Sequence, residues 1–495
     1  MADLKSLAKD TAIYGLSSII GRFLNYLLVP IYTAKLAAAS GGYGVITEVY
    51  SYTALLLVVL TFGMETTFFR FINKENEDPL RVYATTLVAV GGVGLCFLAF
   101  VFGFLPQVSA FLDYADHPEY IGMMATCVAI DAFQCIPFAY LRYKRRPIKF
   151  AALKLLFIFA NIVLNIVFFV VLNCNDVFYA FAINLVCTAS ITLFFLPELT
   201  GFSWKPDMPL LRKMLSYSWP ILVLGIAGIL NQTADKIIFR HVMKGPVGKV
   251  ELGIYGASVK IAMIMAMITQ AFRYAYEPFV FAGQRDKDNR QTYAKAMKFF
   301  IIFTLLAFLV VMGYLDVLKH IIAPDYWPGL KVVPIVMAAE IMMGIYFNLS
   351  FWYKLTDRTI WGAVFSGVGC VVLIVVNILF IPQYSYMACA WAGVAGYGTA
   401  MLLSYFVGQK YYPIAYPLKS IAVYVLVAAF FFLVMTYTPQ TWPLWARLGI
   451  NTLCIVLFLA HIVYHDLPLS SLPVVGKYFL SLIHISEPTR PISIS

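Results

Sequence analysis

The stretch GGYGVITEVYSYTALLLVVLTFGMETTFFRF, residues 41–71, indicates how the chain folds. Its apolar part is long enough for a membrane-spanning helix, which needs roughly 20 predominantly apolar residues. Its opening motif GGYG, residues 41–44, has a counterpart in GIYG, residues 253–256. The glutamate that follows the first motif, Glu65, corresponds at the same spacing to Glu277. The sequence therefore predicts a membrane protein made of two related halves.

The composition agrees with this class of protein. Of the 495 residues, 61% are hydrophobic and only 12% are charged, whereas about a quarter of a soluble protein is charged. So few charges cannot cover the surface of a soluble particle, which argues against a soluble enzyme, a nucleic-acid-binding protein and a secreted disulfide scaffold. The eight cysteines show no CxxC spacing, so we expect neither disulfides nor a metal site.

Apolar segments of spanning length recur along the whole chain. We predict an all-α polytopic fold with about fourteen transmembrane helices, at about residues 11–36, 43–70, 82–106, 119–141, 149–172, 177–198, 214–239, 252–281, 297–315, 332–353, 359–381, 385–408, 420–437 and 443–464.

The distribution of basic residues predicts the orientation. With a cytoplasmic N-terminus, 23 Lys and Arg residues fall in inner loops and seven in outer loops, as the positive-inside rule requires. One outer loop departs from the rule, because it contains Arg240, Lys244 and Lys249. We expect a multi-pass protein of the bacterial inner membrane.

The repeat predicts the domain organisation. Each motif opens the second span of a six-span block, so both halves have the same orientation. We predict a six-helix lobe at residues 1–203, a second at 204–409, and two additional helices within 410–479. A parallel repeat of this kind is typical of an alternating-access carrier that binds its substrate between the lobes.

Ionisable residues within the spans are candidates for function, because a charge in hydrocarbon is costly. Helical spacing places Arg22 and Asn25 on one face of the first span, and Arg273 and Glu277 on one face of the eighth. For Glu48 and Lys236, near span ends, we favour a structural ion pair or a side chain that reaches the interface. The remaining candidates are Lys154, Asn161 and Asn165 in the fifth span, and Glu65, Asp131, Asp235, Lys260 and Glu340.

Two pairs of segments resemble a known family. LKSLAKDTAIYGLSSIIGRFLNYLLVPIYTAKL and YGVITEVYSYTALLLVVLTFGMETTFFRF, with SWPILVLGIAGILNQTADKIIF and GIYGASVKIAMIMAMITQAFRYAYEPFVF, are similar to bacterial polysaccharide biosynthesis proteins of the oligosaccharide flippase family. That family belongs to the multidrug/oligosaccharidyl-lipid/polysaccharide exporter superfamily. The resemblance implies a V-shaped, MATE-like pair of six-helix bundles with two extra helices. It also implies transfer of undecaprenyl-pyrophosphate-linked oligosaccharide from the cytoplasmic to the periplasmic leaflet.

The resemblance and the buried charges together predict a binding site. Related lipid II flippases place arginines of spans 1 and 8 in a central cavity, and Arg22 and Arg273 occupy similar places here. Guanidinium groups bind phosphate well, so we expect these two to hold the pyrophosphate, with Lys154 or Lys260 assisting. We expect Asn25, Asn161 and Asn165 to contact sugar. Coupling to a proton or sodium gradient, or charge balance, is expected of Glu65, Asp131, Asp235 and Glu277.

Other functions stay open. A cation-coupled multidrug antiporter of the same superfamily would use the buried acids, and a lipid II flippase would use the same arginines. An enzyme is not expected, because no long loop carries a catalytic constellation. Expected partners are the lipid-linked oligosaccharide, membrane lipids and a glycan polymerase, with no cofactor. The segment LSLIHISEPTR, residues 480–490, reads like a translated sequencing adapter, so residues 480–495 are expected to be non-native.

Overall fold

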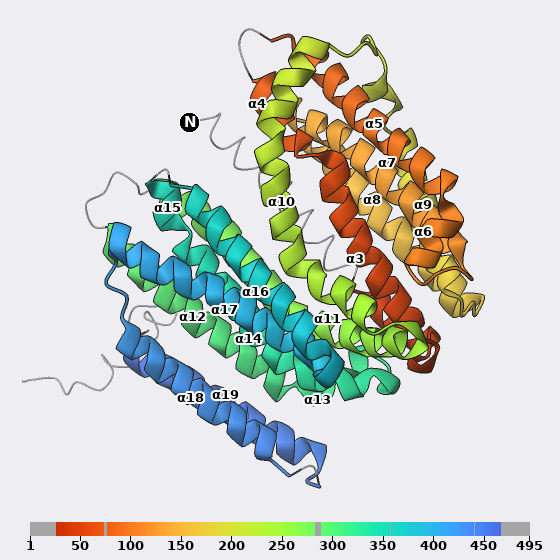
Figure 1. Ribbon diagram of the computed structural model, residues 1–495. Coiled ribbons are helices and arrows are strands. Elements are labelled where there is room, and N and C mark those ends of the chain that lie inside the picture. The colour runs from red at the N-terminus through yellow and green to blue at the C-terminus, as the bar shows by residue number, and fades with distance from the viewer. Residues whose placement is uncertain (1–25, 74–76, 283–288, 357, 440, 467–495) are drawn as a thin grey trace, which may run out of the picture. The chain divides into compact units, whose positions relative to one another are not determined.

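The computed structural model describes residues 26–73, 77–282, 289–356, 358–439 and 441–466. Within these ranges it describes every side chain except those of residues 274–289. Over these ranges the chain is helical and has no strand (Figure 1). Among the residues that the structure describes, twelve helices are long and apolar enough to cross a membrane. A shorter apolar helix, α9 (Val177–Leu193), accounts for the predicted span 177–198. Within the first predicted span, residues 11–36, the structure describes the helix α2 (Leu28–Lys35). The predicted all-α membrane fold is confirmed.

Two compact units make up the chain: residues 1–273 with 319–412, and residues 274–318 with 413–495. The division into two lobes and two extra helices stays a prediction. The main helices of the first unit are α3 (Gly42–Thr61), α4 (Met64–Ile72), α5 (Pro79–Gly103), α6 (Leu105–Phe111), α7 (Pro118–Tyr143), α8 (Pro147–Asn165), α9, α10 (Met208–Val242), α11 (Gly245–Ala282, to Arg273), α14 (Val333–Leu349), α15 (Phe351–Leu355), α16 (Ile360–Tyr384) and α17 (Tyr386–Tyr411).

The predicted span 43–70 is interrupted. Phe62 and Gly63 have φ angles of 49° and 67°, in the left-handed region, and they separate α3 from α4. The carbonyl of Phe62 accepts a hydrogen bond from Ser218 Oγ of α10 at 2.5 Å. A Cβ on Gly63 would lie 2.9 Å from the side chain of Ile221, so glycine suits both the conformation and the close approach of α10.

Helix α10 connects two hydrophobic cores. Near its beginning, Leu210 and Met214 are buried with Phe68 and Tyr83 of the first half. Near its end, Phe239 is buried with residues of α11, η6 (Pro324–Val332) and α17. In Figure 1, α10 runs from the neighbourhood of α4 and α5 to that of α11 and α16. The second half of the chain is therefore joined to the first through one continuous helix.

The second unit contains α12 (Asn289–Gly313), α18 (Leu418–Tyr437) and α19 (Leu444–His465), which pack on one another. Asn451 of α19 donates a hydrogen bond to the carbonyl of Gly313 at 2.7 Å. Beyond the end of α19, Asp466 pairs with Lys298 and accepts from Tyr424. Partial burial by itself would raise the pKa of Asp466. The hydrogen bonds from Lys298 and Tyr424 outweigh it and hold this pKa below its usual value.

Candidate functional site

The two glycine motifs of the repeat touch each other. A Cβ on Gly44 would lie 1.8 Å from the carbonyl oxygen of Lys249 and 3.0 Å from the backbone nitrogen of Gly253. On Gly253 it would lie 2.9 Å from the nitrogen of Gly44, and on Gly256 it would lie 2.4 Å from Thr47 Oγ1. Real Cβ atoms do not approach so closely, so α3 and α11 meet here only because these positions are glycine. We call this the glycine contact.

The tyrosines of the two motifs have different partners. The rings of Tyr43 and Tyr326 lie edge to face, with centroids 5.9 Å apart, and the Tyr326 hydroxyl donates to the carbonyl of Leu36 at 2.6 Å. Tyr255 instead donates to Asp235 Oδ2 at 2.7 Å. The first tyrosine therefore strengthens the contact between the halves, whereas the second holds a buried carboxylate within the second half.

A buried arginine lies beside the glycine contact. Arg240, at the end of α10, donates from Nε to Glu48 Oε2 at 2.9 Å and from Nη2 to Asp113 Oδ2 at 2.7 Å. Its side chain is 1% exposed and that of Glu48 is 2% exposed. Tyr114 donates to Glu48 Oε2 at 2.5 Å, and Lys249 Nζ donates to the carbonyl of Asp113 at 3.0 Å. We call these five residues the Arg240 cluster.

The Arg240 cluster accounts for the basic loop that departs from the predicted charge distribution. Arg240 and Lys249 are paired with acids, so two of the three cations that depart from the positive-inside rule are neutralised locally. Partial burial opposes ionisation of Asp113, but the hydrogen bonds from Arg240 and from the Gly245 N–H are stronger and lower its pKa. Glu48 forms an ion pair, as favoured above. Arg240 is not among the predicted site residues, although a basic residue on the wrong side was the available signal.

Three predicted residues lie together within the first half. Lys154 Nζ lies 4.0 Å from the centroid of the Phe138 ring and is close enough to Asp131 and Glu65 to interact with both carboxylates. Glu65 forms an ion pair with Arg142. The thiol of Cys135 also contacts Glu65, with 3.8 Å between Sγ and Oε2. This group holds two acids and two cations, so its charges balance locally.

The two predicted asparagines bind each other. Asn161 and Asn165 are buried on α8, and Asn165 Nδ2 donates to the Asn161 carbonyl at 2.8 Å and to its Oδ1 at 3.0 Å. The Oδ1 atom of Asn165 is buried, and no hydrogen-bond partner for it lies among the described residues. Both side chains therefore face the interior of the first half in this conformation.

A second polar group lies between α10, α11 and α14. Asp235 accepts from Lys236 Nζ at 3.0 Å and from Tyr255. Lys236 is also close enough to Lys260 and Glu340 to act on their charges. The predicted residues Asp235 and Lys260 therefore lie in one region. Together with Glu340 and Lys236 they make up two acids and two lysines.

The predicted phosphate clamp is described only in part. Arg273 lies over the Phe347 ring, with its guanidinium carbon 4.7 Å from the ring centroid. Arg22, Asn25 and the side chain of Glu277 lie outside the described residues. Across the described ranges, no group of three or more His, Cys, Asp or Glu side chains could hold a metal ion.

These features define a multi-pass helical membrane protein whose repeated halves meet at their glycine motifs. The family described as polysaccharide biosynthesis protein matches residues 40–328. This is more than half of the chain, and the chain belongs to that family. A search of curated proteins finds no match.

Three solved structures show the same fold. The lipid II flippase MurJ, in an inward closed conformation, has a TM-score of 0.71 and 13% identity, covering 91% of this chain and 98% of that one. An inward-facing multidrug resistance MATE family transporter of the MOP superfamily has a TM-score of 0.59 and 14% identity, covering 81% and 94%. The MATE multidrug transporter DinF-BH has a TM-score of 0.58 and 16% identity, covering 81% and 95%. The predicted membership of the polysaccharide biosynthesis family is confirmed, and the chain has the fold of these transporters.

Proposed function

We propose that the protein is an alternating-access flippase for undecaprenyl-pyrophosphate-linked oligosaccharide. The observation that carries the proposal is the glycine contact, in a chain of the polysaccharide biosynthesis family. A carrier that alternates needs two related halves that close tightly at one end and separate there in another conformation. The glycine contact lets the backbones of the two halves meet closely, and the Arg240 cluster lies beside it. Such a contact is suited to the end at which the two halves close.

The proposed orientation follows from the basic loops. A cytoplasmic N-terminus, in the bacterial inner membrane, puts the glycine contact on the periplasmic side. The conformation described here is then closed toward the periplasm. The proposed direction of transfer is from the cytoplasmic to the periplasmic leaflet, where a glycan polymerase would use the product.

The proposed substrate site keeps the predicted residues. Arg22 and Arg273 hold the pyrophosphate, with Lys154 or Lys260 assisting, because planar guanidinium groups bind two phosphate oxygens at once. Asn25, Asn161 and Asn165 contact sugar, which requires the buried asparagine pair to become accessible in another conformation. Coupling to a proton or sodium gradient falls to Glu65, Asp131, Asp235 and Glu277.

Complementation of a strain that lacks its own oligosaccharide flippase tests this proposal. Arg22→Ala and Arg273→Ala should each abolish surface polysaccharide at normal protein levels. Arg212→Ala, at an exposed arginine near the beginning of α10, is the matched control and should complement fully. Full complementation by both of the first two variants would rule out the phosphate clamp.

Two further candidate functions are supported by the structural likeness. The similarity to MurJ supports a lipid II flippase, for which depletion of the protein would stop peptidoglycan synthesis. The similarity to MATE transporters supports a drug antiporter, for which deletion would increase sensitivity to cationic drugs. Loss of surface polysaccharide with neither of these effects would favour the oligosaccharide flippase.

A further inference from the structure

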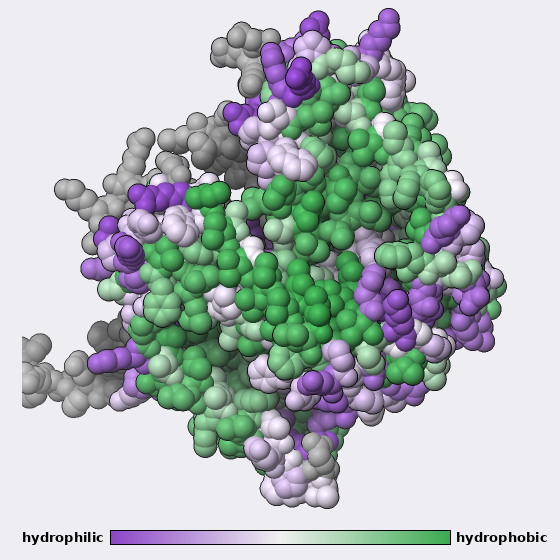
Figure 2. All heavy atoms as spheres, in the orientation of Figure 1, coloured by the Kyte–Doolittle hydropathy of each residue, from purple (hydrophilic) through white to green (hydrophobic). Residues whose placement is uncertain are grey.

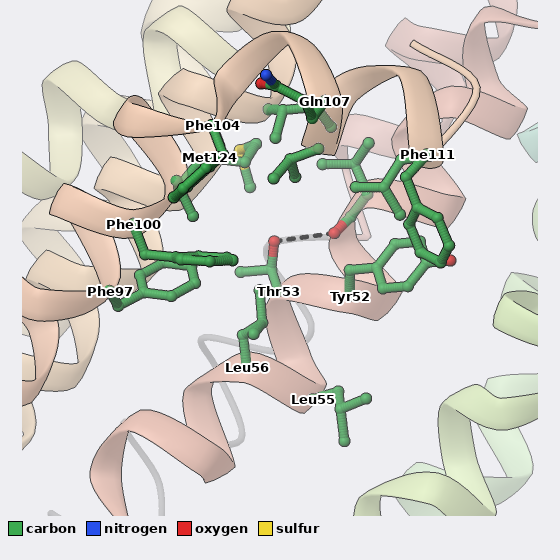
Figure 3. Close-up of a pocket in the computed structure, with 16 residues that line it drawn as sticks. Tyr52, Thr53, Leu55, Leu56, Phe97, Phe100, Phe104, Gln107, Phe111 and Met124 are labelled. Carbon is green, nitrogen blue, oxygen red and sulfur yellow. Dashed lines mark hydrogen bonds between the residues drawn. The ribbon is translucent and has the colours of Figure 1, made fainter.

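An apolar cavity of about 540 Å³ lies in the first half, between α3, α5, α6 and α7. Figure 3 shows aromatic and aliphatic side chains of these helices pointing toward one another around it. The hydroxyl of Thr53 is already used, since it donates to the Val49 carbonyl at 2.9 Å within α3. The hydroxyl of Tyr52 lies 3.3 Å from His241 Nδ1. The cavity thus offers few free polar groups to a ligand.

The occupant of this cavity must be apolar. A buried water needs two to four polar partners, and a sugar needs more, so neither suits such a lining. Phe100, Phe104 and Phe111 line the cavity and are 59%, 52% and 75% exposed. The lining is therefore continuous with the apolar outer surface of the spans, which Figure 2 shows as a broad hydrophobic area on the face in view. A hydrocarbon chain can enter from the bilayer.

The volume of the cavity matches that of a single short lipid chain. At about 30 Å³ for a group the size of a water molecule, the cavity holds roughly 18 such groups, which is about one phospholipid acyl chain. An undecaprenyl chain, with about 55 carbon atoms, would need roughly three times this volume by the same measure. We propose that this cavity binds one acyl chain of a membrane phospholipid. This binding site does not depend on the proposed flippase activity.

The cavity adjoins the Arg240 cluster. The lining residue Val49 directly follows Glu48, and the lining residue Leu112 directly precedes Asp113. The rings of Tyr52 and Phe111 both contact His241, with centroids 6.4 and 5.9 Å away. An acyl chain therefore packs against the two segments that supply the carboxylates of Arg240, and it stabilises the arrangement in which α10 joins them.

Photolabelling of the full chain in vesicles tests the site. The vesicles contain phosphatidylethanolamine and phosphatidylglycerol in equal amounts, with a trace of phosphatidylethanolamine that carries a diazirine in one acyl chain. Mass spectrometry should find the label on peptides of α3 and α5–α7 more often than on α18, which is also largely lipid-exposed. Val108→Phe and Ala125→Leu, which fill the cavity from two different walls, should each abolish this excess.

The controls separate the site from general lipid contact. Leu95→Phe, at a position of α5 that is 70% exposed and does not line the cavity, should leave the excess unchanged. The variants are compared at equal amounts of monodisperse protein, and labelling of α18 serves as the internal standard. Equal labelling of all lipid-facing helices, or an excess that survives in both filling variants, would overturn the proposal. A polyprenyl phosphate probe that labels these peptides more strongly than the phospholipid would overturn the acyl-chain assignment.

Discussion

Arg240 at the end of α10 is bonded to Glu48 near the beginning of α3, with 2.9 Å between Nε and Oε2 and almost no exposure of either side chain. Residues that lie 192 positions apart thus form one buried ion pair. Breaking such a pair leaves an uncompensated charge in a site from which water is excluded. The first prediction follows from this relationship.

Arg240→Ala should destabilise the protein strongly, by about 3–5 kcal/mol, because the buried Glu48 carboxylate loses its partner. Replacing both residues, as Arg240→Met with Glu48→Leu, should recover much of this loss. Thermal unfolding of the purified protein measures the effect, and Lys244→Ala, at an exposed lysine nearby, is the control. A change for Arg240→Ala no larger than the control would contradict the buried pair.

Gly44→Ala should disturb the glycine contact without greatly altering the helix itself. The added Cβ would meet the Lys249 carbonyl oxygen at 1.8 Å, so the two helices must separate, at a cost of about 1–3 kcal/mol for overpacking. Transport in the complementation assay should fall, and a cysteine at Thr47 should react faster with a water-soluble maleimide. Gly92→Ala is the matched control, because nothing lies within 4 Å of a Cβ there. Equal behaviour of the two alanine variants would disprove the contact.

Asp113 should make the stability depend on acid pH. Its pKa is lowered in the folded protein, so its contribution is fully present above the ordinary aspartate value of about 3.9. The contribution is lost as the pH falls through the lowered value. Unfolding temperatures measured from neutral pH downward should therefore converge for the wild type and Asp113→Asn at the acid end. A difference that stays constant over the whole range would refute this, and Asp116→Asn, at an exposed aspartate, should follow the wild type.

Asn451→Leu should weaken the packing of α19 on α12. The side chain is buried and donates to the Gly313 carbonyl at 2.7 Å, and the loss of a buried bond that leaves the carbonyl unpaired costs about 1–3 kcal/mol. Limited proteolysis should cut the segment between α18 and α19 faster than in the wild type. Leu453→Asn, which changes an exposed neighbour on the same helix, should instead affect lipid contact and not this packing.

Much of the fold could be predicted because hydrophobic length is a local property. The predicted spans 119–141 and 420–437 differ from helices α7 and α18 by only two residues at any end. The interruption at Phe62 was not predictable in this way, since Ser218 of another helix stabilises it. The repeat indicated which residues correspond, but it did not indicate that Gly44 and Gly253 touch.

The site was less accessible to prediction, for a related reason. A charged residue in an apolar run signals function or pairing, but its partner is fixed by tertiary packing. Glu65 pairs with Arg142, whose position in a basic loop indicated only topology. Arg240 was similarly treated as part of a loop, although it is more buried than any predicted site residue with a basic side chain that the structure describes.

The placement of α10 in two cores has a mechanical consequence. Its first turns are built into one core through Met214, and its last turns into another through Phe239. Pro220 lies between them, where it removes a backbone hydrogen bond from the helix ladder. Any rotation of one core against the other would have to bend α10 or break its packing in one of them. The missing backbone hydrogen bond makes the turn around Pro220 the part of the helix where such a bend costs least.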